Sequence, residues 1–120
     1  MDPISLAIVA ALGKLGENVI KDSYEALKAA IAHKCGVDSE LAKAVATVEK
    51  KPDSAARKEI LKEEVAAAKL EQDPEILRAA HALIAKIKEL PDGQTIITQT
   101  VTGDKNIFSG TGNVTVTNNT

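Results

Sequence analysis

The sequence predicts an all-α fold, a four- to five-helix bundle followed by a flexible C-terminal tail, and three observations support this. The first ninety residues are rich in Ala, Leu, Lys and Glu, which favour helix. Every Ala lies before Leu90, whereas all Thr residues except Thr47 lie after it, in a segment with little charge. Pro91-Asp92-Gly93 forms a turn signal between these two parts. We therefore divide the chain into a helical bundle over residues 1–90 and a tail over residues 91–120.

The first two helices are predicted from their ends and their apolar spacing. Asp2-Pro3 has the pattern of an N-cap followed by proline at the first helical position, which opens a helix through about Leu15. A second helix is predicted over 17–35, and Gly36 is well placed to end it. The apolar residues that recur along one face of this helix are Ile20, Tyr24, Leu27 and Ile31.

Three further helices are marked in the same way. Asp38 or Ser39 caps a helix that stops before Pro52, Asp53 or Ser54 caps the next one, and Asp73-Pro74 opens the last. The linkers are short, so successive helices should be antiparallel neighbours. The residues expected to point inward are Leu41, Val45, Val48, Leu61, Val65, Ala68, Leu77, Ala80, Ile84 and Ile87.

The first helix differs from the others because Ser5 is its only polar side chain between Ile4 and Leu12. A helix that is apolar all round is either buried at the centre of a bundle or able to enter a membrane. The two interpretations are compatible if the bundle can release the helix. The apolar segment is too short to span a bilayer alone, which takes about 20 residues, and no basic region precedes it as in a signal peptide. The residues expected to enter lipid are Ile4, Leu6, Ile8, Val9, Leu12 and Leu15.

The tail has the pattern of short β-strands. Apolar or amide side chains alternate with threonine over 97–102, a short strand is predicted at 107–108, and alternation returns over 114–117. Three such strands bury too little apolar surface to fold alone, but identical copies can stack in register as cross-β amyloid with Asn and Gln ladders. An unstructured tail, or a pair of strands docked on the bundle, remains an alternative. The residues expected in an amyloid core are Ile97, Gln99, Val101, Gly103, Asn106, Ile107, Phe108, Gly110, Gly112, Asn113, Val114 and Val116.

Composition and motifs argue against several classes of function. A net charge of −2 and only two aromatic residues disfavour nucleic-acid binding. The single cysteine, Cys35, excludes a disulfide within the chain and favours a cytoplasmic location. His33 lies two positions from Cys35, on a different helix face, and His81 has no evident catalytic partner. We therefore expect no enzyme, no metal site and no cofactor.

Two stretches resemble known cell-death modules. The tail string Thr102-Gly103-Asp104-Lys105-Asn106-Ile107-Phe108-Ser109-Gly110-Thr111-Gly112-Asn113-Val114 resembles the bacterial amyloid signalling motifs, which are similar to fungal prion-type motifs and the animal RHIM. The bundle is similar to the Bell domain, a bacterial counterpart of the fungal HeLo domain. The residues that carry this second similarity are Asp2-Pro3-Ile4, the stretch Val19 to Lys28, Lys51-Pro52-Asp53-Ser54 and Gln72-Asp73-Pro74-Glu75.

These resemblances imply a non-enzymatic effector of regulated cell death. An NLR-like receptor that carries a matching motif would template the tail into a fibril of this chain, and the clustered bundles would release the first helix into membrane lipid. The protein would be cytoplasmic at rest and act at the inner face of the plasma membrane. Two alternatives remain: an adaptor bundle, recruited by the same amyloid tail, that never touches lipid, and a small enzyme or ligand-binding bundle with an incidental tail.

Overall fold

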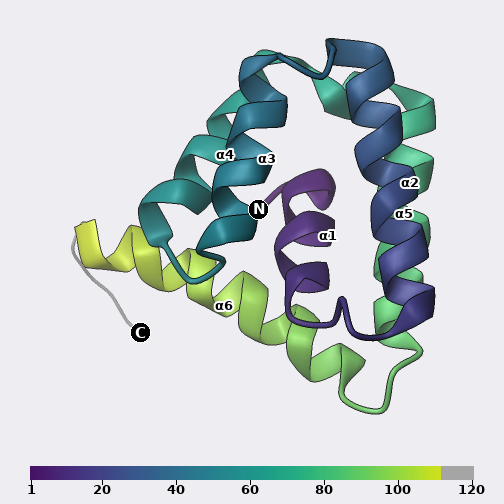
Figure 1. The fold of residues 1–120 in the computed structure, drawn as a ribbon. Coiled ribbons are helices and arrows are strands. Elements are labelled where there is room, and N and C mark those ends of the chain that lie inside the picture. The colour runs from purple at the N-terminus through teal and green to yellow at the C-terminus, as the bar shows by residue number, and fades with distance from the viewer. Residues whose placement is uncertain (112–120) are drawn as a thin grey trace.

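The computed structural model describes the backbone of residues 1–111 and the side chains of residues 1–102, and over that range its regular elements are all helices (Figure 1). The elements are α1 (Pro3–Leu12), α2 (Asn18–Cys35), α3 (Glu40–Lys50), α4 (Ala55–Ala67), the short 3₁₀ turn η1 (Leu70–Gln72), α5 (Pro74–Lys88) and α6 (Gly93–Thr111). The all-α prediction is confirmed: residues 1–90 hold five α-helices, as expected for the bundle, and the sixth helix, α6, lies in the segment expected to be the tail.

The helix starts follow the predicted capping residues. Asp2 accepts a hydrogen bond from the backbone N–H of Ser5 at 2.8 Å, and Pro3 follows it as the first residue of α1. Ser54, one of the two residues proposed for α4, caps that helix, and Asp73 caps α5. These side chains satisfy N–H groups that have no partner within the helix itself, which fixes where each helix begins.

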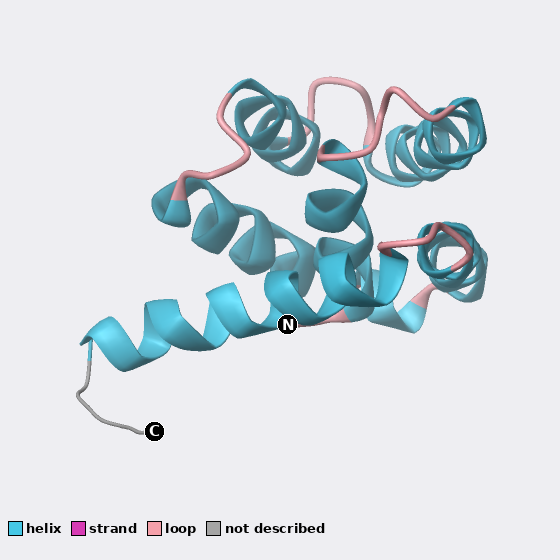
Figure 2. Cartoon of the chain, turned by 90° about the horizontal axis from the view of Figure 1, so that it is seen from below, coloured by secondary structure: helices cyan, strands magenta, loops and turns pink. Residues whose placement is uncertain are grey.

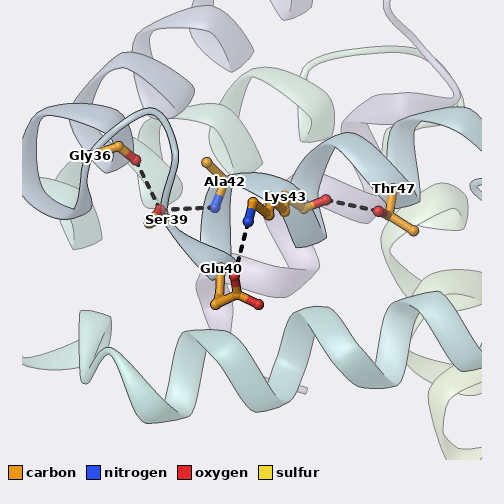
Figure 3. Close-up of polar contacts among 6 residues, drawn as sticks. All are labelled: Gly36, Ser39, Glu40, Ala42, Lys43 and Thr47. Carbon is orange, nitrogen blue, oxygen red and sulfur yellow. Dashed lines mark hydrogen bonds and ion pairs between the residues drawn. The ribbon is translucent and has the colours of Figure 1, made fainter.

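The connection between α2 and α3 shows how tightly one such start is held (Figure 3). The hydroxyl of Ser39 accepts from the N–H of Ala42 at 3.1 Å and donates to the carbonyl of Gly36 at 2.9 Å. Gly36 ends α2 with a φ of 99°, a conformation that side chains disfavour. Further along α3, the Thr47 hydroxyl donates to the carbonyl of Lys43, one turn before it, at 2.8 Å. The predicted turn between the second and third helices is therefore confirmed.

The helices surround α1. The antiparallel pairs α2/α5 and α3/α4 stand on either side of it, and α6 crosses one end of the bundle (Figure 1). Seen from that end, α6 runs along the molecule and continues past the other helices (Figure 2). Helix α1 contacts every other helix and η1, so the core of the protein is assembled around it.

Two helix boundaries and faces differ from the prediction. The first helix ends at Leu12 rather than near Leu15, because Gly13 already takes the C-cap position. In α5 the fully buried face consists of Ile76, Ala80, Leu83 and Ile87, while the expected Leu77 and Ile84 are only half-buried. The two stripes adjoin on the helix surface, so apolar spacing alone did not distinguish the inner one.

The first part of the tail is helical, so the strands predicted at 97–102 and 107–108 are wrong for this state of the protein. Ile96, Ile97, Thr100 and Val101 lie at helical spacing, and α6 packs with this face against α1 and α5. Burial on the bundle therefore outweighs the strand preference of these residue types, which depends strongly on context. The strand predicted at 114–117 lies outside the described residues.

Gly93 fixes the point where α6 meets the bundle. A Cβ placed on Gly93 would lie 1.8 Å from the carbonyl oxygen of Ile87 and 2.8 Å from the Cα of Lys88. These are backbone atoms of the last turn of α5, so no side-chain rotation can relieve the overlap. The start of α6 can approach α5 this closely only because residue 93 is glycine.

We expect Gly93→Ala to displace α6 and destabilise the fold, by about 1–3 kcal/mol or more for a forced overlap in a packed site. Gly13→Ala is the matched control, because nothing lies within 4 Å of a Cβ at that position and its φ is negative. Urea unfolding measures the stability of both variants, and hydrogen exchange reports on the amides of residues 94–102. Equal behaviour of the two variants would contradict the close packing of α6.

A second prediction concerns acid stability. The hydrogen bond from the backbone N–H of Ile76 to Asp73, aided by the ammonium of Lys34 at 3.3 Å, holds the pKa of the Asp73 carboxyl below its usual range. The ionised Asp73 carboxylate therefore stabilises the folded state above its unfolded-state pKa of about 3.9. This contribution is lost as the pH falls through the lower pKa that the group has in the folded protein.

Urea unfolding between pH 5 and pH 2 should show this loss in the native protein and a smaller one in Asp73→Asn. Asparagine caps helices about as well as aspartate but carries no charge to titrate, so the variant separates the charge from the cap. An identical pH dependence in both proteins would show that Asp73 does not contribute to it.

Candidate functional site

The residues predicted to enter lipid lie on or next to the central helix. Ile4 and Ile8 are fully buried, while Leu6, Val9 and Leu12 are half-buried on α1. Leu15 is half-buried in the turn that follows. The structure therefore confirms a central core helix and places the most apolar segment of the chain out of contact with solvent on most of its surface.

The walls around α1 are aliphatic. Its most extensive neighbour is α5, which presents Ile76, Ala80, Leu83 and Ile87. The small residues Ala7, Ala10 and Ala11 of α1 are also buried, which lets the surrounding helices approach closely. Such packing is non-directional and proportional to the apolar area removed from water. Helix α1 is thus held mainly by burial.

Ser5 is the exception within α1. Its side chain is fully buried, and its hydroxyl oxygen has no hydrogen-bond partner among the described residues. The sequence shows Ser5 as the only polar side chain of this helix, and its burial depends on the helices packed around it, which the sequence pattern does not reveal.

Part of the predicted amyloid segment covers α1. Ile97 of α6 belongs to the core at 7% exposure, Val101 is half-buried and Gln99 is exposed. Gly103, Asn106, Ile107, Phe108 and Gly110 belong to the backbone of α6. The remaining predicted residues lie outside the described part: Gly112, Asn113, Val114 and Val116.

A shallow cleft of about 330 Å³ marks the line where α6 crosses α1. From α1 it is lined by Val9, Ala10 and Gly13, and from α6 by Ile96, Gln99 and Thr100. The Thr100 hydroxyl donates to the carbonyl of Ile96 at 2.8 Å, within α6 itself. The Thr100 hydroxyl is therefore already paired within its own helix, and the residues that α1 brings to the cleft are apolar.

One ion pair connects the turns at the ends of these two helices. The ammonium of Lys14, after α1, lies 2.9 Å from a carboxylate oxygen of Asp92, before α6. The hydrogen bond from Lys14 lowers the pKa of Asp92. Both side chains are partly exposed, so solvent screens the attraction and the pair adds little stability. The pair therefore orients the turn after α1 relative to the turn before α6 but contributes little to holding them together.

A second polar cluster joins α2 to α3. The Tyr24 hydroxyl donates to a carboxylate oxygen of Glu49 at 2.5 Å, and the ammonium of Lys28 lies 2.8 Å from the same oxygen. Burial and the hydrogen bond to this carboxylate raise the pKa of the Tyr24 hydroxyl, which stays protonated at neutral pH. Because the hydroxyl, the carboxylate and the ammonium are already paired with one another, we assign this cluster a structural role in joining α2 to α3.

The remaining chemistry-bearing residues do not gather into a site. No group of histidine, cysteine and acidic residues suited to a metal ion occurs in residues 1–102. Cys35 is a half-buried free thiol at the end of α2, and His33 and His81 are exposed. None of the helices described here is long and apolar enough to cross a bilayer.

The comparison with known protein families covers the whole chain. Residues 1–120 match the family model of the Het-E N-terminal domain, while no curated protein and no solved structure matches. The match supports the HeLo-like part of the resemblance and extends neither to the Bell group nor to a bacterial amyloid motif. The chain belongs to the Het-E N-terminal domain family, a fungal HeLo-like family related to cell death.

Proposed function

We propose that this protein is a non-enzymatic effector of regulated cell death that stores α1 in its bundle and releases it to lipid when the tail forms cross-β amyloid. One observation carries the proposal: the predicted amyloid segment begins within α6, which packs against α1. The same residues cannot be helix on the bundle and strand in a fibril. Amyloid formation through Ile97 would therefore remove a core side chain.

The energetic scale favours such a coupling. Removing an isoleucine side chain from a core forfeits about 1.5–3 kcal/mol of apolar burial. A small domain is stable by only about 5–15 kcal/mol, so losing Ile97 and the half-buried Ile96 and Val101 consumes a large share. Loss of α6 would also uncover Val9 and Ala10 on α1. Fibril formation would thus weaken the seat of α1 directly.

Many copies of the released helix would have to act together on a membrane. Its 10 residues span about 15 Å, half of a hydrocarbon core of about 30 Å. A single copy can enter the interface but cannot cross it. A fibril holds many bundles side by side, and clustering multiplies weak membrane affinities. Resting protein would be cytoplasmic and activated protein would collect at the inner face of the plasma membrane.

The trigger would be a matching motif on an NLR-like receptor. The stretch 102–114 resembles bacterial amyloid signalling motifs, and in-register stacking requires a template of closely similar sequence. The partners of this protein are therefore further copies of itself, the receptor and membrane lipid, and the Bell-like assignment of the bundle belongs to this proposal.

A second candidate is a lipid-independent adaptor recruited through the same tail. It is favoured by a groove of about 230 Å³ between α2 and α3, whose apolar lining includes Ile31, Val37 and Val45. Val37 is 76% exposed at the connection between the two helices. A partner helix could bury this valine and fill the groove, in which case α1 would remain in place.

Seeded conversion tests the proposal. Fibrils of a peptide of residues 92–120 should bind thioflavin T, convert the full-length protein, and make it release dye from vesicles containing phosphatidylglycerol. Conversion without leakage would favour the adaptor. Absence of fibrils would rule out both candidates.

The membrane role of α1 is tested with Val9→Gln. Val9 is half-buried, so the change leaves the bundle more intact than any polar substitution of the fully buried Ile8. Ile84→Gln in the likewise half-buried part of α5 is the control for lost stability. We expect Val9→Gln to reduce seeded leakage about tenfold or more at unchanged fibril yield, and Ile84→Gln to preserve it. Equal leakage from both variants would argue against insertion of α1.

A further inference from the structure

Ser5 is the one fully buried polar residue in the part of the chain that the structure describes. Its backbone N–H is satisfied by Asp2, at 2.8 Å from the carboxylate oxygen. Its hydroxyl oxygen, in contrast, has no hydrogen-bond partner within that part. A single unsatisfied polar atom therefore sits at the start of the helix around which the core is built.

Such an arrangement is unfavourable and uncommon. Folding strips a buried hydroxyl of its hydrogen bonds to water, and without a new partner that loss is not recovered. Most buried polar groups in native proteins are paired, so an exception calls for a reason. An alanine at position 5 would avoid this cost, and the same helix already buries alanine at positions 7, 10 and 11.

Two half-buried residues share the face of α1 that carries Ser5. Val9 and Leu12 follow Ser5 at spacings of four and seven, which places all three on one side of the helix. Val9 lines the cleft beneath α6, and Leu12 lines a separate cleft of about 430 Å³ beside α2. Release of α1 that begins at these clefts would proceed along the side where the hydroxyl lies.

The penalty exists only while α1 is seated. Every apolar side chain of α1 loses burial when the helix moves into water, whereas the Ser5 hydroxyl regains hydrogen-bond partners from water, from lipid headgroups or from another helix. A group shifts an equilibrium only by the difference between its interactions in the two states. Ser5 is thus the one side chain of the helix that favours the released state in all of these surroundings.

We propose that the buried Ser5 hydroxyl is a built-in destabilising group that sets how readily α1 leaves the bundle. Its consequence for activation rests on the proposed function above, but its effect on the seating of α1 does not. The hydroxyl acts as a regulatory element of the fold, which keeps the central helix releasable.

The test compares Ser5→Ala with Ser23→Ala. Ser23 lies half-buried inside α2, so its replacement also exchanges serine for the better helix former alanine, without removing a fully buried hydroxyl. Native-state hydrogen exchange of the α1 amides measures the opening equilibrium in the full-length protein, and urea unfolding provides an independent value.

We expect the opening equilibrium of α1 to fall about tenfold further in Ser5→Ala than in Ser23→Ala, which corresponds to about 1.4 kcal/mol. Equal shifts in the two variants would overturn the proposal. Faster opening in Ser5→Ala would also overturn it, because the hydroxyl would then contribute favourable packing.

Seeded leakage from phosphatidylglycerol vesicles separates this proposal from the proposed function. A longer lag in Ser5→Ala than in Ser23→Ala supports a role in activation. An unchanged lag despite slower exchange overturns that role. If the native protein causes no leakage at all, the membrane function fails, while the exchange result still decides whether Ser5 controls the seating of α1.

Discussion

The burial of α1 is the constraint on which the rest of the structure depends. This helix contacts every other element, so the remaining helices are arranged as its cover as much as they are packed on one another. A chain of this size has a small core and a narrow margin of stability. An apolar helix at the centre therefore has two effects: it supplies a large share of the core, and it couples any movement of the outer helices to its own exposure.

The α6 segment illustrates how one sequence can satisfy two periodicities. Ile97 and Val101 are four residues apart, which places them on one face of a helix, and with Gln99 between them they also share one face of a strand. The bundle offers the helical pattern an apolar surface, whereas a stack of identical chains offers the strand pattern a complete hydrogen-bond ladder. If the proposed fibril forms, the available partner would thus decide between the two structures, rather than local preference alone.

How much of the fold the sequence predicts also depends on whether a feature is set by local residues or by distant partners. Caps and apolar spacing act locally, so Asp2, Ser39 and Asp73 identified their helix starts correctly from the sequence. The helical state of residues 93–102 depends on a surface built by α1 and α5, and the approach at Gly93 exists only in three dimensions. The burial of Ser5 likewise depends on neighbours distant in the sequence. All three features depend on contacts between segments distant in the sequence, where local rules carry least information.

The nature of the contacts around α1 also bears on how it could be released. The ion pair between Lys14 and Asp92 is partly exposed and therefore weak, and the cluster of Tyr24 and Glu49 joins α2 to α3 without involving α1. What holds the central helix is apolar burial, which has no directional bonds to break one by one and declines with each surface that is uncovered. Removal of α6 uncovers one side, and the unsatisfied hydroxyl of Ser5 already disfavours the seated state. A lipid surface would then offer the exposed aliphatic side chains an environment as apolar as the core they leave, so the proposed membrane role would use the same apolar surface that makes α1 the centre of the core.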